Sequence, residues 1–188
     1  REDIDRILAI KEGAPGCDIT LDANQGYSPP DAVHFLEELK TNNIRPLLFE
    51  QPVVKHDLPG MRFVKDHTSV PVGADESVFT SADAINIARS GCADVINIKL
   101  MKSGIIEALD IAAIARSANL KLMIGCMLET RLALGCAVHF AAGLGGFGFI
   151  DLDPHLDPEE DPFGGGPAFT DPVYRLSDDL PGIGVFRK

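Results

Sequence analysis

The chain has 188 residues, of which 45% are hydrophobic, and it carries a formal net charge of −11. Its length is sufficient for one domain with a sizeable core, and its mean hydropathy of +0.08 excludes a disordered chain. The acidic balance argues against nucleic acid and anionic membranes as partners, and the chain contains no apolar run long enough to span a membrane.

Six short apolar runs predict the strands of a sheet that is covered on both faces. In chain order these runs span residues 18–24, 46–52, 70–77, 93–100, 121–127 and 147–153. Amphipathic stretches between them predict helices over residues 28–40, 81–91, 104–120 and 129–143. Ser28 and Ser81 are suitable N-caps for the first two of these helices, and Gly91 is a suitable stop for the second.

The predicted strands end at regular intervals. Their ends fall near residues 22, 50, 75, 99, 127 and 152, in steps of 28, 25, 24, 28 and 25 residues. A strand–helix unit repeated at this spacing builds a parallel sheet, either open and doubly wound or closed as a barrel. No G-x-G-x-x-G follows the first strand, which disfavours a dinucleotide-binding open sheet. A closed barrel needs eight units and six are present. The α/β fold is therefore either a fragment, that is a partial (β/α) barrel, or a barrel whose other two strands come from elsewhere.

The tail of the chain has a different composition. From residue 154 onward it is rich in proline, glycine and aspartate, and it has no helical period. A flexible linker is one interpretation, but the tail has several apolar side chains that could anchor it: Phe163, Phe169, Val173, Tyr174, Leu176, Ile183 and Val185. We therefore predict an incomplete barrel domain over residues 1–153, and an extended segment over 154–188 that packs against another part of the protein.

Three consecutive predicted strands each end in one carboxylate: Asp22, Glu50 and Asp75. Neighbouring strands lie about 4.8 Å apart, so these acids would converge and repel one another. A hard divalent cation relieves this repulsion, and an all-oxygen set of ligands suits Mg²⁺. Any one of these acids is more simply a solvated loop residue, but three in phase predict a metal site.

The fourth predicted strand ends in Lys99, which shares a face with Asn97. A lysine that points into a barrel mouth beside a metal loses solvation and experiences positive charge, and both effects favour its neutral form. Such a lysine can act as a general base. Lys102, which lies past the strand, is expected to be solvated.

The last predicted strand ends in Asp151 and Asp153, which face the same way, while Leu152 faces the opposite way. Two like charges on one face are costly unless a cation lies between them, so the pair could bind a substrate ammonium. A solvated acidic loop explains them equally well. Among the other polar residues, Glu129 is explained by its position at the start of a helix.

The histidines and cysteines indicate no further site. The five histidines show neither H-x-H nor H-E-x-x-H spacing, so zinc is not expected. The four cysteines show no C-x-x-C spacing and are expected to be thiols in a reducing compartment. No basic segment followed by an apolar one predicts a leader, and we expect a cytoplasmic protein.

Five stretches together resemble the enolase superfamily, in its muconate-lactonizing-enzyme-like subgroup: LDANQGY, LFEQPV, VGADESVFT, INIKLMKSG and GCMLETRLALGCAVHFAA. The resemblance implies that Asp22, Glu50 and Asp75 are Mg²⁺ ligands and that Lys99 is an acid/base lysine. It also implies that the chain contains strands three to eight of the barrel, without the first two strands and the N-terminal capping domain. The tail over 154–188 would then pack on that missing capping domain.

The stretch DLDP resembles the Asp-x-Asp motif of dipeptide epimerases, in which the pair (here Asp151 and Asp153) holds the ammonium of the substrate. The implied reaction removes the proton next to a carboxylate, passes through an enediolate that Mg²⁺ stabilises, and returns a proton on the opposite face. The family pairs its lysine with a second one, in a Lys-x-Lys motif. Lys11 does not fit that motif, so this chain alone is expected to be inactive.

Other functions stay open. The subgroup also includes cycloisomerases, o-succinylbenzoate synthases and N-acylamino acid racemases, and a non-catalytic fragment that binds a carboxylate or a metal is a further alternative. We expect a small-molecule substrate as the partner, neither nucleic acid nor a membrane, and we leave a homo-oligomer open.

Overall fold

The computed structural model describes residues 2–153, 160–170, 172–177 and 179–188. The chain divides into two compact units. The first unit comprises Arg1–Val78 and Ala82–Ile96, and the second comprises Phe79–Ser81 and Asn97–Lys188.

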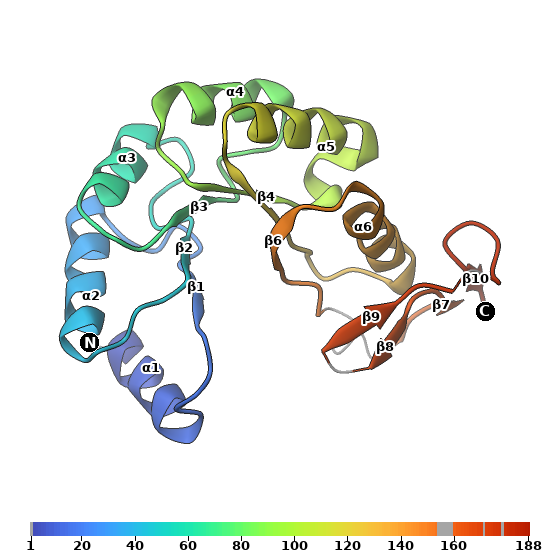
Figure 1. The fold of residues 1–188 in the computed structure, drawn as a ribbon, viewed down its shortest axis with the longest axis horizontal. Helices are drawn as coiled ribbons and strands as arrows, with labels where there is room; N and C mark the ends of the chain where they lie inside the picture. The colour runs from blue at the N-terminus through green and yellow to red at the C-terminus, as the bar shows by residue number, and fades with distance from the viewer. Residues whose placement is uncertain (1, 154–159, 171, 178) are drawn as a thin grey trace. The chain divides into compact units, whose positions relative to one another are not determined.

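Six parallel strands form one sheet whose order in space is their order in the sequence (Figure 1). They are β1 (Thr20–Asp22), β2 (Leu48–Glu50), β3 (Val72–Ala74), β4 (Val95–Ile98), β5 (Lys121–Ile124) and β6 (Phe147–Ile150). Each predicted strand is present, although each spans only three or four residues. A sheet in which sequence neighbours pair in parallel requires a crossover after every strand, and helices provide it.

The helices are α1 (Glu2–Gly13), α2 (Pro29–Thr41), α3 (Leu58–Asp66), α4 (Ser81–Ser90), α5 (Leu100–Ser117) and α6 (Arg131–Leu144). The four predicted helices correspond to α2, α4, α5 and α6. No predicted helix corresponds to α3, which has only nine residues. It begins because Asp57 caps it, with Oδ1 accepting a hydrogen bond from the backbone N–H of Gly60 at 2.8 Å.

In the first unit, helices α2 and α3 lie side by side along β1, β2 and β3 (Figure 1). Three aromatic rings connect α2 to the sheet. Tyr27 stacks on Phe35 at 5.1 Å between ring centroids, and Phe49 lies 5.9 and 5.8 Å from these two rings. Phe49 is buried in the middle of β2, so this cluster holds the strand that carries Glu50 against its covering helix.

In the second unit, α6 packs on the last two strands of the sheet. The buried residues of this cluster are Ile124, Leu134, Ala137, Val138 and Leu152. Helix α5 is interrupted near its start by Gly104, which has a φ of 72°. Glycine adopts this left-handed conformation without the steric cost that a side chain would add. The first turn of α5, directly after Lys99, is therefore not continuous with the rest of the helix.

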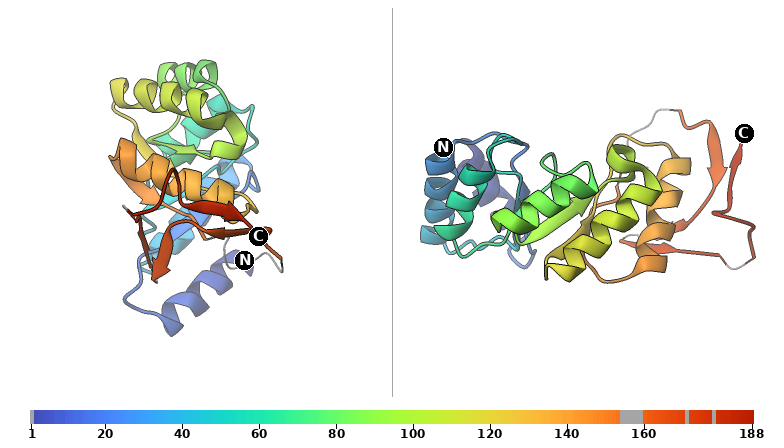
Figure 2. Two further views of the ribbon diagram at one scale, coloured as in Figure 1. Left: turned by 90° about the vertical axis from the view of Figure 1, so that its right-hand side faces the viewer. Right: turned by 90° about the horizontal axis from the view of Figure 1, so that it is seen from above.

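The described part of the tail is extended and packs on α6. It forms two antiparallel pairs, β7 (Phe163–Gly165) with β10 (Val185–Arg187), and β8 (Ala168–Thr170) with β9 (Val173–Arg175). Figure 2 shows β7 and β10, in red, beside the orange helix α6. The approach is close, because a Cβ added to Gly135 of α6 would lie 3.2 Å from Val185 Cγ2.

The tail also contacts the segment directly after β6, since the hydroxyl of Tyr174 donates a hydrogen bond to the backbone oxygen of Leu152 at 2.6 Å. The predicted domain boundary at residue 154 falls on residues 154–159, which lie outside the described residues. Packing of the tail on a capping domain stays a prediction.

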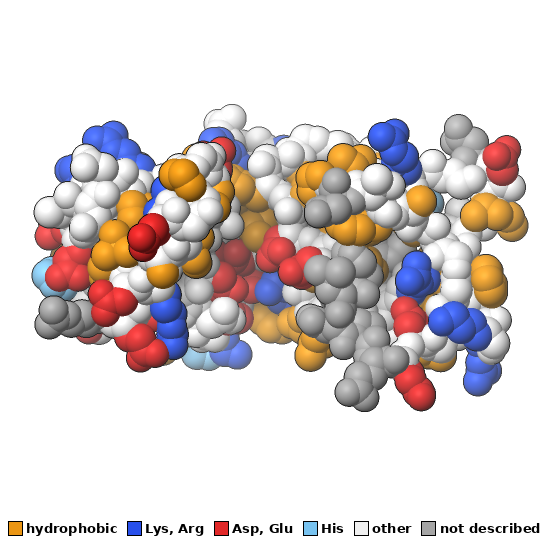
Figure 3. All heavy atoms as spheres, turned by 90° about the horizontal axis from the view of Figure 1, so that it is seen from below, with side chains coloured by type: hydrophobic (Ala, Val, Ile, Leu, Met, Phe, Trp, Pro, Cys, Tyr) orange, Lys and Arg blue, Asp and Glu red, His pale blue; other side chains and the backbone are white. Residues whose placement is uncertain are grey.

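All four cysteines are free thiols. Lysine and arginine side chains form small separate groups between acidic ones on the face that Figure 3 shows. In the part of the chain that the structure describes, no helix combines the length and the apolar character needed to cross a membrane.

Replacement of Asp57 by alanine is expected to lower the free energy of unfolding by about 1 kcal/mol, because α3 loses its N-cap. Denaturant unfolding of the purified protein measures this change. The matched control is Asp57→Asn, whose side-chain oxygen can still accept the hydrogen bond from Gly60. An equal loss of stability in both variants would show that the charge of Asp57, rather than its cap, is what matters.

Candidate active site

The register of the parallel strands brings three carboxylate residues to neighbouring positions. Asp22, at the end of β1, is the Cα partner of Glu50, at the end of β2. Glu50 is in turn the partner of Gly73 in β3, and Asp75 follows Gly73 by two residues. Because side chains alternate along a strand, residues two apart share a face, so all three acids belong to the same side of their strands.

Two of these three acids are buried: Glu50 is 4% exposed and Asp75 is 2% exposed. Asp22 is exposed, and its Oδ1 accepts a hydrogen bond from the backbone N–H of Asn24 at 2.8 Å. Burying carboxylates costs free energy unless a positive charge compensates for it. A donor set made only of carboxylate oxygens, two of them from buried side chains, is chemically suited to Mg²⁺.

Over the described ranges, no three side chains of His, Cys, Asp or Glu lie close enough together to hold a metal ion as they stand. The chemistry of the acids and their strand register fit a shared ion, but their side chains would have to turn toward one another to bind it.

Lys99 lies in the second unit, at the N-cap position of α5, and is partly buried. Asn97, which shares its face, is 1% exposed. Both side chains pass close to Gly125, directly after β5. A Cβ added to Gly125 would lie 2.7 Å from Asn97 Nδ2 and 3.0 Å from Lys99 Cε. The missing side chain at Gly125 therefore leaves the space that the stem of Lys99 occupies.

The prediction that Lys102 is solvated is wrong. This lysine is partly buried, and its Nζ donates a hydrogen bond to the backbone oxygen of Asn97 at 2.9 Å. It also lies over the ring of Phe79, 5.7 Å from the ring centroid. Lys102 belongs to the first turn of α5, and this turn directs it back toward the end of β4.

Glu129, which the sequence explains by its position at the start of a helix, is a buried carboxyl in the structure. It is 6% exposed, and its Oε1 accepts a hydrogen bond from the backbone N–H of Met127 at 3.0 Å. Its Oε2 is buried and has no hydrogen-bond partner among the residues described. Burial raises the pKa of this carboxyl, while the Met127 bond and the charge of Lys99 act in the opposite direction. In the sequence Glu129 lies in the stretch GCMLETRL, which resembles the enolase superfamily, but its spacing assigns it no role.

Asp151 and Asp153 follow β6 with the predicted alternation: both are exposed, and Leu152 between them is buried. The thiol of Cys126 donates a hydrogen bond to the backbone oxygen of Asp151 at 3.3 Å. Burial raises the pKa of Cys126 to about 12, and the charges of Asp151, Asp153 and Glu129 add to this shift. Three carboxylates therefore surround Cys126 at the ends of β5 and β6 in the second unit.

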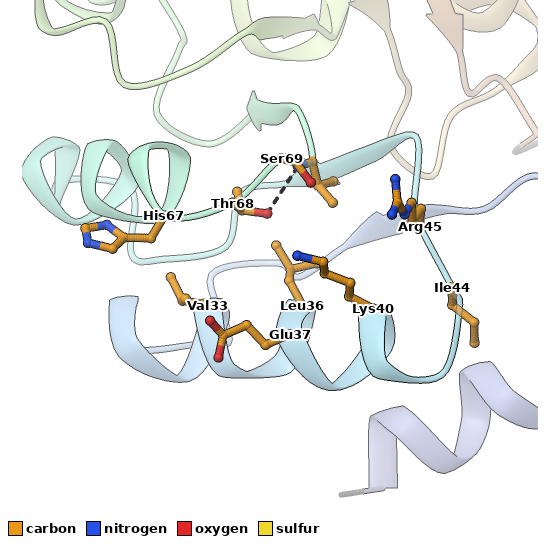
Figure 4. Close-up of a pocket in the computed structure, with 10 residues that line it drawn as sticks. Val33, Leu36, Glu37, Lys40, Ile44, Arg45, His67, Thr68 and Ser69 are labelled. Carbon is orange, nitrogen blue, oxygen red and sulfur yellow. Dashed lines mark hydrogen bonds between the residues drawn. The ribbon is translucent and has the colours of Figure 1, made fainter.

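A separate small pocket, of about 80 Å³, lies in the first unit between α2 and the loop before β3 (Figure 4). Lys40, Arg45 and His67 line it, and Thr68 Oγ1 accepts a hydrogen bond from the backbone N–H of Val70 at 3.1 Å. Its loop residues precede β2 and β3, whereas the three acids stand at the carboxyl ends of strands. The pocket is therefore at the opposite edge of the sheet from the candidate site.

The structure places Asp22, Glu50 and Asp75 in the first unit, and Lys99, Asp151 and Asp153 in the second. Gln51 and Glu129 were not predicted as site residues. Gln51 follows Glu50 directly and is fully buried. Two features of the sequence mark it: it lies in the stretch LFEQPV, and it is a polar residue between a buried strand and a proline.

Known proteins of one family resemble this chain over nearly its whole length. The family model described as "Enolase C-terminal domain-like" matches residues 1–186. An L-Ala-D/L-amino acid epimerase of Populus trichocarpa is 47% identical over 182 residues, which cover 95% of this chain and 43% of that protein.

Two solved structures resemble this chain over most of its length. A mandelate racemase/muconate lactonizing protein from Herpetosiphon aurantiacus has a TM-score of 0.95 and 44% identity, over 99% of this chain and 53% of that one. A dipeptide epimerase from Enterococcus faecalis, complexed with Mg and the dipeptide L-Leu-L-Tyr, has a TM-score of 0.83 and 41% identity, over 88% and 47%.

The chain thus spans about half the length of the curated relatives it matches. The resemblance seen in the sequence is confirmed, as is the fold class, an α/β domain that forms part of an enolase-type (β/α) barrel. The chain belongs to the enolase C-terminal domain-like family.

Proposed function

We propose that the protein is a Mg²⁺-dependent epimerase of dipeptides, which inverts the carbon next to the substrate carboxylate. The observation that carries this proposal is the set of three carboxylate residues at the ends of consecutive parallel strands, Asp22, Glu50 and Asp75. Relatives at 43–47% identity that are named dipeptide or L-Ala-D/L-amino acid epimerases support it.

In this proposal Asp22, Glu50 and Asp75 hold the cation. When bound, Mg²⁺ would supply positive charge at the substrate carboxylate, which makes the neighbouring C–H more acidic. The Mg complex of the Enterococcus faecalis epimerase supports this assignment by similarity. Burial of Glu50 and Asp75 also supports it, because these acids keep little contact with water.

Lys99 is proposed as the group that moves the proton. In one direction of the reaction Nζ, as a neutral amine, takes the proton from the α-carbon. In the reverse direction Nζ, as an ammonium, gives a proton to the α-carbon. Its stem is confined beside Gly125, which limits the positions that Nζ can adopt. A second acid/base group on the opposite face of the substrate is required for inversion, and we assign no residue of this chain to that role.

Asp151 and Asp153 are proposed to bind the ammonium of the dipeptide. Both are exposed, share one side of the chain, and stand beside the buried Leu152. An extended dipeptide separates its carboxylate from its ammonium by about two residue lengths, on the order of 6–7 Å. The two acids would therefore distinguish free dipeptides from N-acylated amino acids, which lack this charge.

Another reaction of the same subgroup, or binding without catalysis, is the competing function. The exposed acidic pair favours a substrate with an ammonium, which separates dipeptides from carboxylate substrates that lack this charge, such as N-acylated amino acids. A cytoplasmic location and the oligomeric state stay predictions.

The metal assignment predicts that Asp75→Asn weakens Mg²⁺ binding by at least about tenfold, because one negative ligand is lost. Isothermal titration calorimetry of the complete protein measures this affinity. Glu12→Gln, which changes an exposed acid on α1, is the matched control and should bind Mg²⁺ as the unmodified protein does. Unchanged affinity in Asp75→Asn would remove this residue from the metal site.

The function itself is tested by incubating the complete protein with Mg²⁺ and a dipeptide library in deuterated water. Deuterium is expected to enter the α-position of the carboxyl-terminal residue, as read by mass spectrometry. Lys99→Ala should slow this exchange by about 100-fold or more for at least one enantiomer, while Mg²⁺ affinity stays nearly unchanged.

The control for this experiment is Lys121→Ala, which removes an exposed lysine at the start of β5. Exchange at a normal rate from both enantiomers of the substrate in Lys99→Ala would exclude Lys99 from the mechanism. A library without any exchanging member would favour a binding protein over an epimerase.

The acidic pair predicts a difference between two substrate classes. In the proposed complex the substrate ammonium would be desolvated against the two acids. Asp151→Asn or Asp153→Asn should then weaken the binding of free dipeptides by roughly 2–5 kcal/mol, and that of N-acylated amino acids far less. Steady-state kinetics or competition measures both classes. Asp110→Asn, an exposed acid on α5, is the control. Equal losses for both classes would mean that the pair is structural.

A further inference from the structure

Gln51 occupies an unusual backbone position beside the proposed metal ligands. It follows Glu50 directly, is 0% exposed and has a φ of 35°. Positive φ values cost free energy in residues other than glycine, because the Cβ crowds the backbone. A residue keeps such a conformation only when its contacts hold it there. The contacts of Gln51 therefore show which segments of the structure depend on its strained backbone.

The carboxamide of Gln51 uses both of its polar atoms toward the segment that carries Asp75. Its Oε1 accepts hydrogen bonds from the backbone N–H groups of Asp75 at 2.9 Å and Ser77 at 3.1 Å. Its Nε2 donates to Ser77 Oγ at 2.8 Å and to the backbone oxygen of Val53 at 3.0 Å. Two acceptor and two donor interactions satisfy this buried amide completely.

The backbone of Gln51 forms hydrogen bonds with two further segments. Its N–H donates to the oxygen of Gly73 at 2.9 Å, and its carbonyl oxygen accepts from the N–H of Gln25 at 2.8 Å. One residue is therefore bonded to the loop after β1, to the end of β3 and to the segment around Asp75. These are the segments that contain the three acids, or follow them directly.

We propose that Gln51 is a positioning residue for the metal site. It holds the backbone of Glu50 and of Asp75 in one register, so that both carboxylates face the same divalent cation. The inference rests on the proposed function, since it assumes that these acids bind a cation. Gln51 itself does not contact the cation in this proposal.

The chemistry of the side chain explains why a glutamine is needed. Methionine has a similar length, but it leaves the buried N–H of Asp75 without its acceptor. Glutamate keeps acceptor atoms but cannot donate to Val53 and Ser77, and it adds a negative charge beside two buried acids. Asparagine is one methylene shorter and cannot reach both partners.

The test measures Mn²⁺ affinity of the complete protein by electron paramagnetic resonance, which needs neither substrate nor activity. We expect Gln51→Met to bind Mn²⁺ about tenfold or more weakly than the unmodified protein. Ser77→Ala should show a smaller loss, because it removes one bond of the carboxamide and keeps the one to Asp75.

The control is Asp57→Ala, which removes the N-cap of α3 in the same unit and none of the atoms that bond Gln51. Helix α3 reaches Gln51 through Met61, whose Sδ lies 3.5 Å from Nε2, while the bonds of Gln51 to Asp75, Ser77 and Val53 lie outside this helix. Asp57→Ala should leave the Mn²⁺ affinity of the folded protein unchanged. A structural role alone would give equal affinities in all folded variants, or equal losses in Gln51→Met and Asp57→Ala, and either result overturns the inference.

The remaining outcomes are also decisive. Absence of Mn²⁺ and Mg²⁺ binding in the unmodified protein overturns the proposed metal site, and the inference with it. Normal binding in the unmodified protein and in Gln51→Met overturns the inference alone. If Gln51→Met does not fold, Ser77→Ala decides: weaker Mn²⁺ binding supports the inference, and unchanged binding overturns it.

Discussion

Parallel pairing of short strands is the constraint on which the rest of this structure depends. A helix returns the chain after each strand, so the carboxyl end of every strand reaches the same edge of the sheet. The ladder continues past the strands themselves, as in the bond from Ala23 N–H to the oxygen of Glu50 at 3.0 Å. Residues that follow strands by one or two positions are therefore held almost as firmly as the strands.

This arrangement allows the protein to bury polar groups that would otherwise be costly. Glu50, Gln51 and Asp75 are nearly inaccessible, although they lie where strands give way to loops. A buried polar network stabilises a single conformation only when its members are satisfied, and is a liability when they are not. In the first unit the carboxamide of Gln51 meets that condition, with three bonds to backbone atoms and one to the hydroxyl of Ser77.

The sequence was sufficient to predict the repeat, because apolar runs of four to eight residues at a regular spacing are a strong signal. It was also sufficient to predict that Asp151 and Asp153 share a side, since alternation follows from strand geometry alone. Helix α3 could not be predicted in this way, because nine residues contain too few turns to show a period. Its start depends on a cap and a proline.

The roles of Gln51 and Glu129 depend on contacts between segments distant in the sequence. Gln51 meets residues around position 77, and the burial of Glu129 results from packing at the start of α6. Lys102 differs from its prediction for a similar reason, since Gly104 separates the first turn of α5 from the rest of the helix. All three residues lie in the stretches that resemble the enolase superfamily, but hydrophobic period and strand spacing do not predict their contacts.

The position of Lys99 before α5 has an electrostatic consequence. Unsatisfied N–H groups give the amino end of a helix a partial positive charge, and lysines that stabilise helices therefore stand near the carboxyl end. Lys40 and Lys65 follow this rule in the last turns of α2 and α3. Lys99 stands at the amino end of α5 instead, where a positive charge gains no stabilisation from the helix dipole, and the break at Gly104 leaves only one turn of helix directly after it. The position of the Lys99 side chain is therefore set by its packing beside Gly125 and not by helix electrostatics.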